Sequence, residues 1–291
     1  MSTRFLDALK SGRVLLMDGA MGTELIGRGL KLDEERTHEW NRRRPAEVEA
    51  IHQAYLKAGA CCLLTNTYAV HQDIAMDEAG SWENWRREYR VALKLARSAG
   101  QVAHFVLLDL GPELRAEVLL LEPTPEAAYD GTLLETLGAV QRLVDLLEIA
   151  SFPRGPCLVS FAFSREHGGL VSLRDKRSPE EIGGFVEQHR DRFTALGVNC
   201  GREMGMDDII EVVQRYREVT DLPLLARPNA GTPVCVGGCW VYPHSPQSMA
   251  ARLPELIDAG ARLIGGCCGT TAAHIAAFRE AIDRLGVGWK S

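Results

Sequence analysis

The chain has no long apolar run, no block of basic residues and few cysteines for its length. No stretch approaches the roughly 20 apolar residues of a membrane-spanning helix, so we expect no membrane segment. Residues 1–14 carry charges throughout, which disfavours a signal peptide. With a net charge of −6 and no basic block, the chain is not expected to bind nucleic acid.

Eight cysteines in 291 residues are too few and too unevenly placed for a disulfide scaffold. We therefore expect reduced thiols and a cytoplasmic protein. The hydrophobic content of 46% suffices for a sizeable core. Nothing in the sequence indicates the oligomeric state.

Short apolar runs alternate with segments of helical period along the whole chain. Eight runs are predicted as strands: Val14–Met17, Cys61–Leu64, Ala103–Leu108, Leu143–Ile149, Cys157–Phe161, Thr194–Val198, Leu222–Ala226 and Arg262–Ile264. Ser178-Pro179 with Glu181 marks a helix start, and Gly59 and Gly260 mark helix ends. No Gly-x-Gly-x-x-Gly follows the first run, which disfavours a dinucleotide-binding sheet. The pattern predicts a single α/β domain over residues 1–291, a (β/α)8 TIM barrel.

The junction before the fifth predicted strand is unusually short. Only seven residues, 150–156, stand between Ile149 and Cys157, and they include two prolines. A parallel crossover normally needs a dozen or more residues, usually with a helix. We therefore predict that the helix after strand four is missing or replaced by a loop. If residues 143–149 are not a strand, the strand count is wrong.

Three cysteines follow predicted strands, at the face where such barrels carry their active residues. Cys200 follows the sixth strand, and Cys267 and Cys268 follow the eighth within Gly-Gly-Cys-Cys-Gly. Adjacent cysteines on an extended backbone point apart and do not bridge each other. Three thiols at strand ends indicate a catalytic zinc with one open position.

An open zinc position suits a substrate that carries a thiol. A free thiol has a pKa of about 8.5 and is mostly protonated at neutral pH. A thiol that binds zinc does so as thiolate, which is the nucleophilic form. The substrate sulfur could then attack a methyl group in line, which is nucleophile activation by coordination.

Five segments carry a resemblance that covers essentially the whole chain. They are Met17–Leu25 (MDGAMGTEL), Thr65–Tyr68 (TNTY), Gly197–Cys200 (GVNC), Pro228–Gly231 (PNAG) and Gly265–Thr270 (GGCCGT). In this order and spacing the chain resembles the homocysteine S-methyltransferase family. These zinc-dependent TIM barrels include the S-methylmethionine and betaine enzymes and the homocysteine module of cobalamin-dependent methionine synthase.

The resemblance implies the residues of a catalytic site. Zn²⁺ would be bound by Cys200, Cys267 and Cys268. Homocysteine would be held by Asp18 and Gly19 after the first strand, by Thr67 after the second and by Glu148 after the fourth. In this interpretation Glu148 holds the substrate ammonium, while Asp18 and the backbone N–H groups of the Gly-Ala-Met-Gly turn contact the amino-acid head group.

The chain departs from the family pattern on the side of the methyl donor. Leu108–Pro112 (LDLGP) stands where the family usually has Gly-Ser-x-Gly-Pro, and the loop that follows, residues 113–123, is apolar and short. Glu148-Ile149 stands where a Glu-Thr pair is usual. The resemblance therefore implies homocysteine as the methyl acceptor more strongly than it implies any particular methyl donor.

The favoured function is zinc-dependent methyl transfer from a small donor, S-methylmethionine or S-adenosylmethionine, to the thiol of homocysteine, giving methionine. One alternative is a methyltransferase fed by a corrinoid protein, or one that acts on another thiol or selenol. An alternative of another class is a non-catalytic zinc-binding barrel in which Cys235 or Cys239 closes a four-sulfur site. Cys61, Cys62 and Cys157, at strand starts, are expected in the core.

Overall fold

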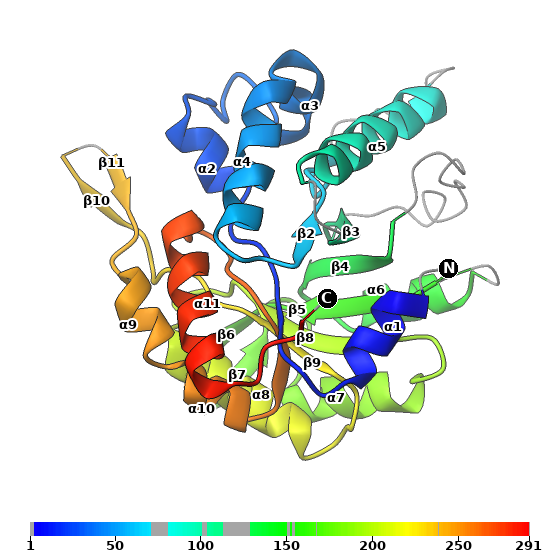
Figure 1. The fold of residues 1–291 in the computed structure, drawn as a ribbon. Coiled ribbons are helices and arrows are strands. Elements are labelled where there is room, and N and C mark those ends of the chain that lie inside the picture. Colours follow the sequence, from blue (N-terminus) through cyan, green and yellow to red (C-terminus); the bar gives the residue numbers. More distant parts are fainter. Residues whose placement is uncertain are drawn as a thin grey trace.

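The computed structural model describes residues 3–70, 81–100, 104–112, 129–149, 152, 155–166, 168–237 and 239–290. Within them, eight parallel strands form one barrel sheet (Figure 1). In spatial order the strands are β1 (Leu15–Leu16), β12 (Ala261–Ile264), β9 (Leu224–Arg227), β8 (Ala195–Asn199), β5 (Cys157–Phe161), β4 (Gly131–Leu137), β3 (Phe105–Leu110) and β2 (Cys62–Leu64). A parallel bridge between Met17 and Cys62 joins β1 to β2 and closes the ring. The predicted TIM barrel is confirmed.

Most of the helices cover the outside of the sheet, whereas α1 (Thr3–Lys10) covers one end of the barrel (Figure 1). The other helices are α2 (Gly22–Gly27), the 3-10 helix η1 (Thr37–Glu39), α3 (Trp40–Arg43), α4 (Pro45–Lys57), α5 (Ser81–Ser98), α6 (Gln141–Leu147), α7 (Pro179–Gln188), α8 (Met206–Arg217), α9 (Pro246–Ala250), α10 (Leu253–Asp258) and α11 (Ala272–Leu285). Among the described residues no helix combines the length and apolar character that a membrane crossing requires.

The fourth strand lies elsewhere than the sequence predicted. The run Leu143–Ile149 is not a strand, because most of it belongs to α6, with Leu143 and Leu146 buried on one helical face. Strand four is Gly131–Leu137, which pairs with β3 and β5. The prediction that the helix after strand four is missing was therefore wrong, since α6 stands between β4 and β5. The barrel still has eight strands, because Gly131–Leu137 takes the place that was predicted for Leu143–Ile149.

The predicted helix ends are confirmed where glycine or a cap signalled them. The Ser178 hydroxyl accepts a hydrogen bond from the Glu181 N–H at 3.3 Å, and the Glu181 carboxylate accepts one from the Ser178 N–H at 2.8 Å. Gly59 and Gly260 adopt positive φ angles of 98° and 114° just before β2 and β12. These turns connect α4 to β2 and α10 to β12.

The barrel interior is apolar at the N-terminal ends of the strands. A buried cluster contains alternate strand residues: Leu15, Met17, Cys62, Leu64, Phe105, Leu107, Leu133, Leu158, Ala195, Leu225 and Leu263. Phe5 of α1 closes this end, with its ring centroid 5.1 Å from that of Phe105, which in turn lies 5.1 Å from Trp289. Cys62 and Cys157 are fully buried, as expected of core cysteines. With the lower end filled, the C-terminal end is left for a site.

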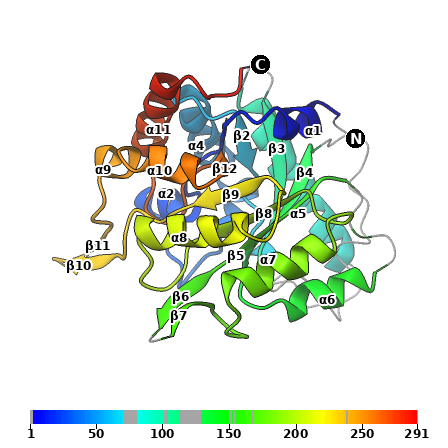
Figure 2. The same ribbon diagram turned by 90° about the horizontal axis from the view of Figure 1, so that it is seen from below.

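Two antiparallel hairpins extend beyond the barrel sheet (Figure 2). The first joins β6 (Phe163–Glu166) to β7 (Gly169–Ser172), and the second joins β10 (Val234–Val236) to β11 (Cys239–Val241). The second hairpin exposes Val234, Val236, Trp240 and Val241. It follows β9, so its base lies at the end of the barrel where the predicted site residues gather.

Candidate active site

Three cysteine sulfurs meet at the C-terminal end of the barrel. The Sγ atoms of Cys200, Cys267 and Cys268 all lie within 4.8 Å of one another. Hydrogen bonds between backbones join the loops that carry them: Cys200 N–H donates to the carbonyl of Arg227, and Cys267 N–H donates to the carbonyl of Pro228. The sequence therefore correctly predicted that these cysteines, 68 residues apart at the widest, form one cluster.

The backbone at Cys200 is held in an unusual conformation. Its φ angle is +55°, in the left-handed region that non-glycine residues rarely occupy. Gly201 follows with φ of +105°, and a Cβ there would lie only 2.4 Å from Met204 Sδ. Such strain is typical of functional sites, because the surrounding structure must hold it in place. Here it turns the chain sharply as it leaves β8.

The donor set of this cluster fits a soft metal ion. Hydrogen bonds from Cys267 and Cys268 lower the pKa of Cys200, while their own pKa values are raised by that same sharing and by burial. The Asn229 amide lies 3.6 Å from the Cys200 sulfur, and the Asn199 amide lies 3.9 Å from the Cys267 sulfur. Three sulfurs with amide donors around them match the ligands of zinc.

No fourth ligand joins these sulfurs within the part of the chain that the structure describes. Cys235, one candidate for closing a four-sulfur site, is exposed on β10. The side chain of Cys239, the other candidate, lies outside the described residues. A three-sulfur site leaves a position for a substrate atom, which a closed structural site does not.

The sulfurs line a cavity of about 400 Å³. This is within the range of small-molecule sites. Its lining residues come from the loops after β1, β2, β8, β9 and β12 and from the ends of β3, β4 and β9: Asp18–Thr23, Ile26, Leu32, Thr37, Leu64–Asn66, Tyr68, Asp109, Glu135, Thr136, Cys200, Arg227, Tyr242, Cys267 and Cys268. Cysteines and carboxylates thus share one space.

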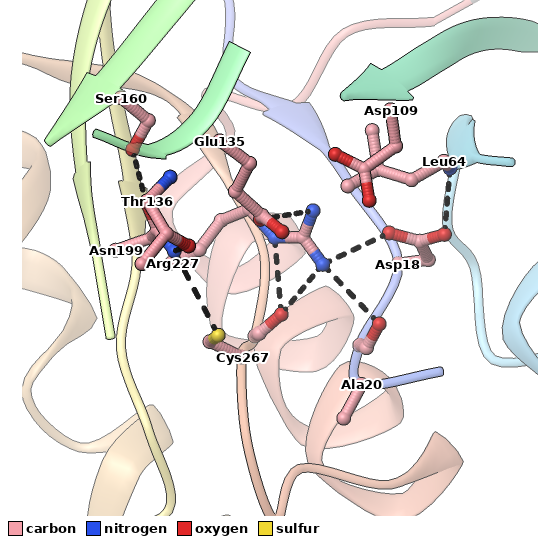
Figure 3. Close-up of polar contacts among 12 residues, drawn as sticks. Asp18, Ala20, Leu64, Asp109, Glu135, Thr136, Ser160, Asn199, Arg227 and Cys267 are labelled. Carbon is pink, nitrogen blue, oxygen red and sulfur yellow. Dashed lines mark hydrogen bonds and ion pairs between the residues drawn. The ribbon is translucent and has the colours of Figure 1, made fainter. Parts of the chain in front are cut away.

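Four charged side chains form the polar floor of this cavity: Asp18, Asp109, Glu135 and Arg227 (Figure 3). Arg227 lies 3.1 Å from a Glu135 oxygen and 3.3 Å from an Asp18 oxygen. It also donates to the carbonyl of Gly266 at 2.8 and 3.0 Å and to that of Gly19 at 3.2 Å. The guanidinium therefore links β9 to the ends of β1, β4 and β12.

Burial dominates the electrostatics of the polar floor. It raises the pKa of Asp18 to about 7, although Arg227 and the Leu64 N–H, which donates to Asp18 at 2.7 Å, act in the opposite direction. Burial also raises the pKa of Glu135, against Arg227. The pKa of Asp109 is raised by burial and by the neighbouring Glu135. Burial alone would lower the pKa of Arg227, but Glu135 and Asp18 raise it.

Asn199 links the ends of β4 and β5 to the cysteine cluster. Its side-chain oxygen accepts hydrogen bonds from the Ser160 hydroxyl at 2.6 Å and from the Thr136 N–H at 3.1 Å. Its amide donates to the Thr136 hydroxyl at 2.8 Å and faces the Cys267 sulfur (Figure 3). Asn199 thereby fixes the positions of the residue after Glu135 and of a cysteine in one network.

Two of the residues predicted to bind substrate line the cavity, and another does not. Asp18 and Gly19 line the cavity, as expected. Thr67 does not: it is buried and donates to the backbone carbonyl of Asp109 at 2.6 Å. In the turn that was expected to contact the head group, Ala20 N–H already donates to the Thr270 hydroxyl at 3.1 Å.

The assignment of Glu148 was wrong. Glu148 is an exposed residue at the C-terminal end of α6, because the run that contains it is a helix outside the barrel. The glutamate at the end of strand four is Glu135, and Thr136 follows it. The Glu-Thr pair that seemed altered is therefore present. The departure at Leu108–Pro112 stands, with Asp109 buried in the cavity, whereas residues 113–123 lie outside the described residues.

The sequence interpretation did not identify Glu135, and it assigned no role to Asp109 or Arg227, although both stand in segments at strand ends that it singled out. A signal for each exists in the two-residue period of its strand. Asp109 stands two residues after the inward-facing Leu107, Glu135 two after Leu133, and Arg227 two after Leu225. A charged residue two positions after an inward-facing apolar residue, near the C-terminal end of a barrel strand, is predicted to face the interior at the floor of the site.

Comparisons with known proteins agree with the resemblance to the homocysteine S-methyltransferase family. The family model described as homocysteine S-methyltransferase matches residues 15–282. The chain is 29% identical to the homocysteine S-methyltransferase of Escherichia coli, over 91% of this chain and 94% of that protein. It is also 29% identical to the methionine synthase of Mycobacterium tuberculosis, over 97% of this chain but only 26% of that longer protein.

Solved structures agree with the sequence relatives. The metallated form of the homocysteine methyltransferase MmuM from Escherichia coli superimposes with a TM-score of 0.70 and 25% identity. The alignment covers 94% of this chain and 98% of that one. Its apo form superimposes with a TM-score of 0.69 and 27% identity.

When the protein is loaded with Zn²⁺, the Cys267→Ala variant is expected to lose the ion, because Cys267 belongs to the sulfur cluster. Losing one of three ligands should weaken zinc binding by more than the roughly 10–100-fold that loss of an outer-shell partner causes. Zinc content after dialysis, measured by atomic spectrometry, reports the effect. Cys235→Ala is the matched control, because Cys235 is an exposed cysteine outside the cluster, and it should retain stoichiometric zinc. Stoichiometric zinc in Cys267→Ala would refute the assignment of the site.

Arg227→Met is expected to lower the free energy of unfolding by about 3–5 kcal/mol, since it leaves buried carboxylates without their counter-ion. Urea denaturation measures this loss. The loss should be larger at mildly alkaline than at mildly acidic pH, because protonation relieves the unpaired carboxylates. Arg215→Met removes a half-buried surface pair with Glu180 and should cost only about 0–1 kcal/mol. Equal losses in the two variants would contradict a structural role for Arg227.

Proposed function

The chain belongs to the homocysteine S-methyltransferase family, and we propose that it transfers a methyl group from a small sulfonium donor to the thiol of homocysteine, giving methionine. S-methylmethionine and S-adenosylmethionine are the favoured donors. The cavity supports homocysteine as the acceptor more directly than it supports either donor.

One observation carries the proposal: the same cavity has three thiols on one side and buried carboxylates in its floor. Homocysteine is a short amino acid with a thiol at one end and, at the other, an α-carbon that bears an ammonium and a carboxylate. A soft-metal site suits the thiol, and Asp18 and Glu135 suit the ammonium. Both ends of the acceptor thus have partners within about 400 Å³.

Zinc is the metal that best matches the cysteine cluster, and Cys200, Cys267 and Cys268 would be its ligands. Zinc bound there would supply a lowered pKa for the acceptor thiol. The existence of a metallated form of MmuM supports a metal in this family. Asn199 and Asn229 then orient two of the sulfurs through their amides.

The polar floor supplies the other half of the site. Glu135, rather than Glu148, is proposed to hold the substrate ammonium together with Asp18. Arg227 keeps Asp18 and Glu135 in position and offsets part of their charge. With the ammonium fixed and the thiol at the sulfur cluster, the attacking atom is held in one orientation, which lowers the entropic part of the barrier.

A second candidate is methyl transfer from a corrinoid protein, and the likeness to one part of a methionine synthase favours it. A donor panel separates the two. The zinc-loaded chain is incubated with homocysteine and with S-methylmethionine, S-adenosylmethionine or betaine, and methionine is measured by mass spectrometry. Methionine formed from a sulfonium donor is the expected result. No methionine from any small donor would exclude the favoured reaction and leave the corrinoid-fed one.

Glu135→Gln is expected to lower kcat/KM for homocysteine by about 10- to 100-fold, since a hydrogen bond to a charged group contributes about 1.5–3 kcal/mol. Steady-state kinetics with homocysteine as the varied substrate measure the change. Glu148→Gln removes the same charge from the surface and should leave kcat/KM unchanged. If Glu148→Gln lowered kcat/KM and Glu135→Gln did not, the assignment of Glu135 as the partner of the substrate ammonium would be wrong.

A further inference from the structure

The polar floor of the cavity carries more negative charge than Arg227 and the ammonium of the acceptor offset. Asp18, Asp109 and Glu135 are three carboxylates, and Arg227 is the one cation that the described residues place among them. The ammonium of homocysteine adds a single positive charge. If all three carboxylates ionise, one negative charge remains in a buried space, where an unpaired charge is costly.

Among the described residues, Asp109 is the one carboxylate of the polar floor that forms no ion pair with Arg227. It is only 6% exposed, and its Oδ1 atom has no hydrogen-bond partner within the described residues. Asp18 differs, because it accepts from Leu64 N–H and lies 3.3 Å from Arg227. Glu135 differs too, because it lies 3.1 Å from Arg227. Figure 3 shows the Asp109 carboxylate turned toward the same space as those of Asp18 and Glu135.

The position of Asp109 is fixed by its backbone. Its N–H donates to the Thr65 hydroxyl at 3.0 Å, and its carbonyl accepts from the Thr67 hydroxyl at 2.6 Å. The two hydroxyls also bond each other at 2.6 Å. Both threonines come from the loop after β2. This clamp holds the end of β3 so that the Asp109 side chain faces the cavity, which gives Thr67 a positioning role.

We propose that Asp109 completes a second cation position in the cavity, and that a positively charged group of a substrate occupies it. This inference rests on the proposed function. Asp109 stands in the segment LDLGP, where the resemblance leads one to expect serine. The carboxylate therefore makes this chain more selective for cationic ligands than a barrel with a neutral residue there. A buried carboxylate that gains a cation within hydrogen-bond distance forms one of the stronger polar contacts in proteins.

Two substrate groups have the required chemistry: the ammonium of the acceptor and the sulfonium of the donor. They are distinguished by ligand pairs that differ in that one charge. Homocysteine is compared with 4-mercaptobutanoate, which lacks the amine. S-methylmethionine is compared with methionine, whose sulfur is neutral. Dissociation constants for all four are measured by isothermal titration calorimetry on the zinc-loaded protein, so that the readout does not depend on turnover.

Asp109→Asn keeps the shape and removes the charge, and Asp109→Ser restores the neutral residue of the family pattern. Both variants should reduce the preference for one charged ligand over its neutral counterpart by about tenfold or more. A reduced preference for S-methylmethionine is the expected result and places the donor sulfonium at Asp109. A reduced preference for homocysteine instead would place the acceptor ammonium at Asp109 rather than at Glu135 and Asp18, and would overturn a separate second cation position. Glu148→Gln is the control for loss of a carboxylate and should change neither preference.

Several outcomes overturn the inference. Unchanged preferences in both Asp109 variants would show that Asp109 meets no substrate cation. Equal weakening of all four ligands would show a merely structural role. In either case the proposed function would stand if wild-type protein binds homocysteine. If wild-type protein binds neither thiol, the proposed function fails and this inference fails with it.

Discussion

The buried guanidinium of Arg227 is the interaction on which the site depends. It extends from the end of β9 and contacts groups after β1 and β12 and at the end of β4. A buried arginine is tolerated only if carboxylates and carbonyls replace its lost hydration. Asp18, Glu135 and two backbone carbonyls do so here. The same contacts bring the ends of strands far apart in the sequence to fixed positions beneath the cysteine cluster.

The barrel divides its interior between stability and chemistry. Alternate strand residues point inward, so each strand contributes an apolar residue to the lower layer and, at β3, β4 and β9, a charged residue to the layer above. Phe5 and Trp289 fill the lower end around Phe105. The cavity lies at the opposite end of the barrel, lined by the loops that follow the strands. Its two chemical ends, soft sulfur and buried carboxylate, match a thiol that also carries an amine.

Much of the fold and the sulfur cluster could be predicted from the sequence, because both depend on local patterns. The apolar runs that follow Gly59 and Gly260 were correctly predicted as strands, and the two cysteines of the Gly-Gly-Cys-Cys-Gly segment were correctly predicted to lie beside Cys200. The run Leu143–Ile149 misled because Leu and Val in close succession suit either a buried strand or a helical face. That error moved the predicted ammonium partner to Glu148, although Glu135 is the residue in the barrel. The role of Arg227 could not be predicted, because its partners Asp18 and Glu135 are distant in the sequence and meet it only when the barrel closes.

The central claim is that Cys200, Cys267 and Cys268 form an open metal site that takes the thiol of an amino-acid substrate. Zinc K-edge X-ray absorption on the zinc-loaded chain, with and without homocysteine, tests it most directly. The account predicts three sulfurs and one lighter, exchangeable ligand before homocysteine is added, and four sulfurs afterwards. Four sulfurs in the absence of homocysteine, or no added sulfur in its presence, would contradict the account.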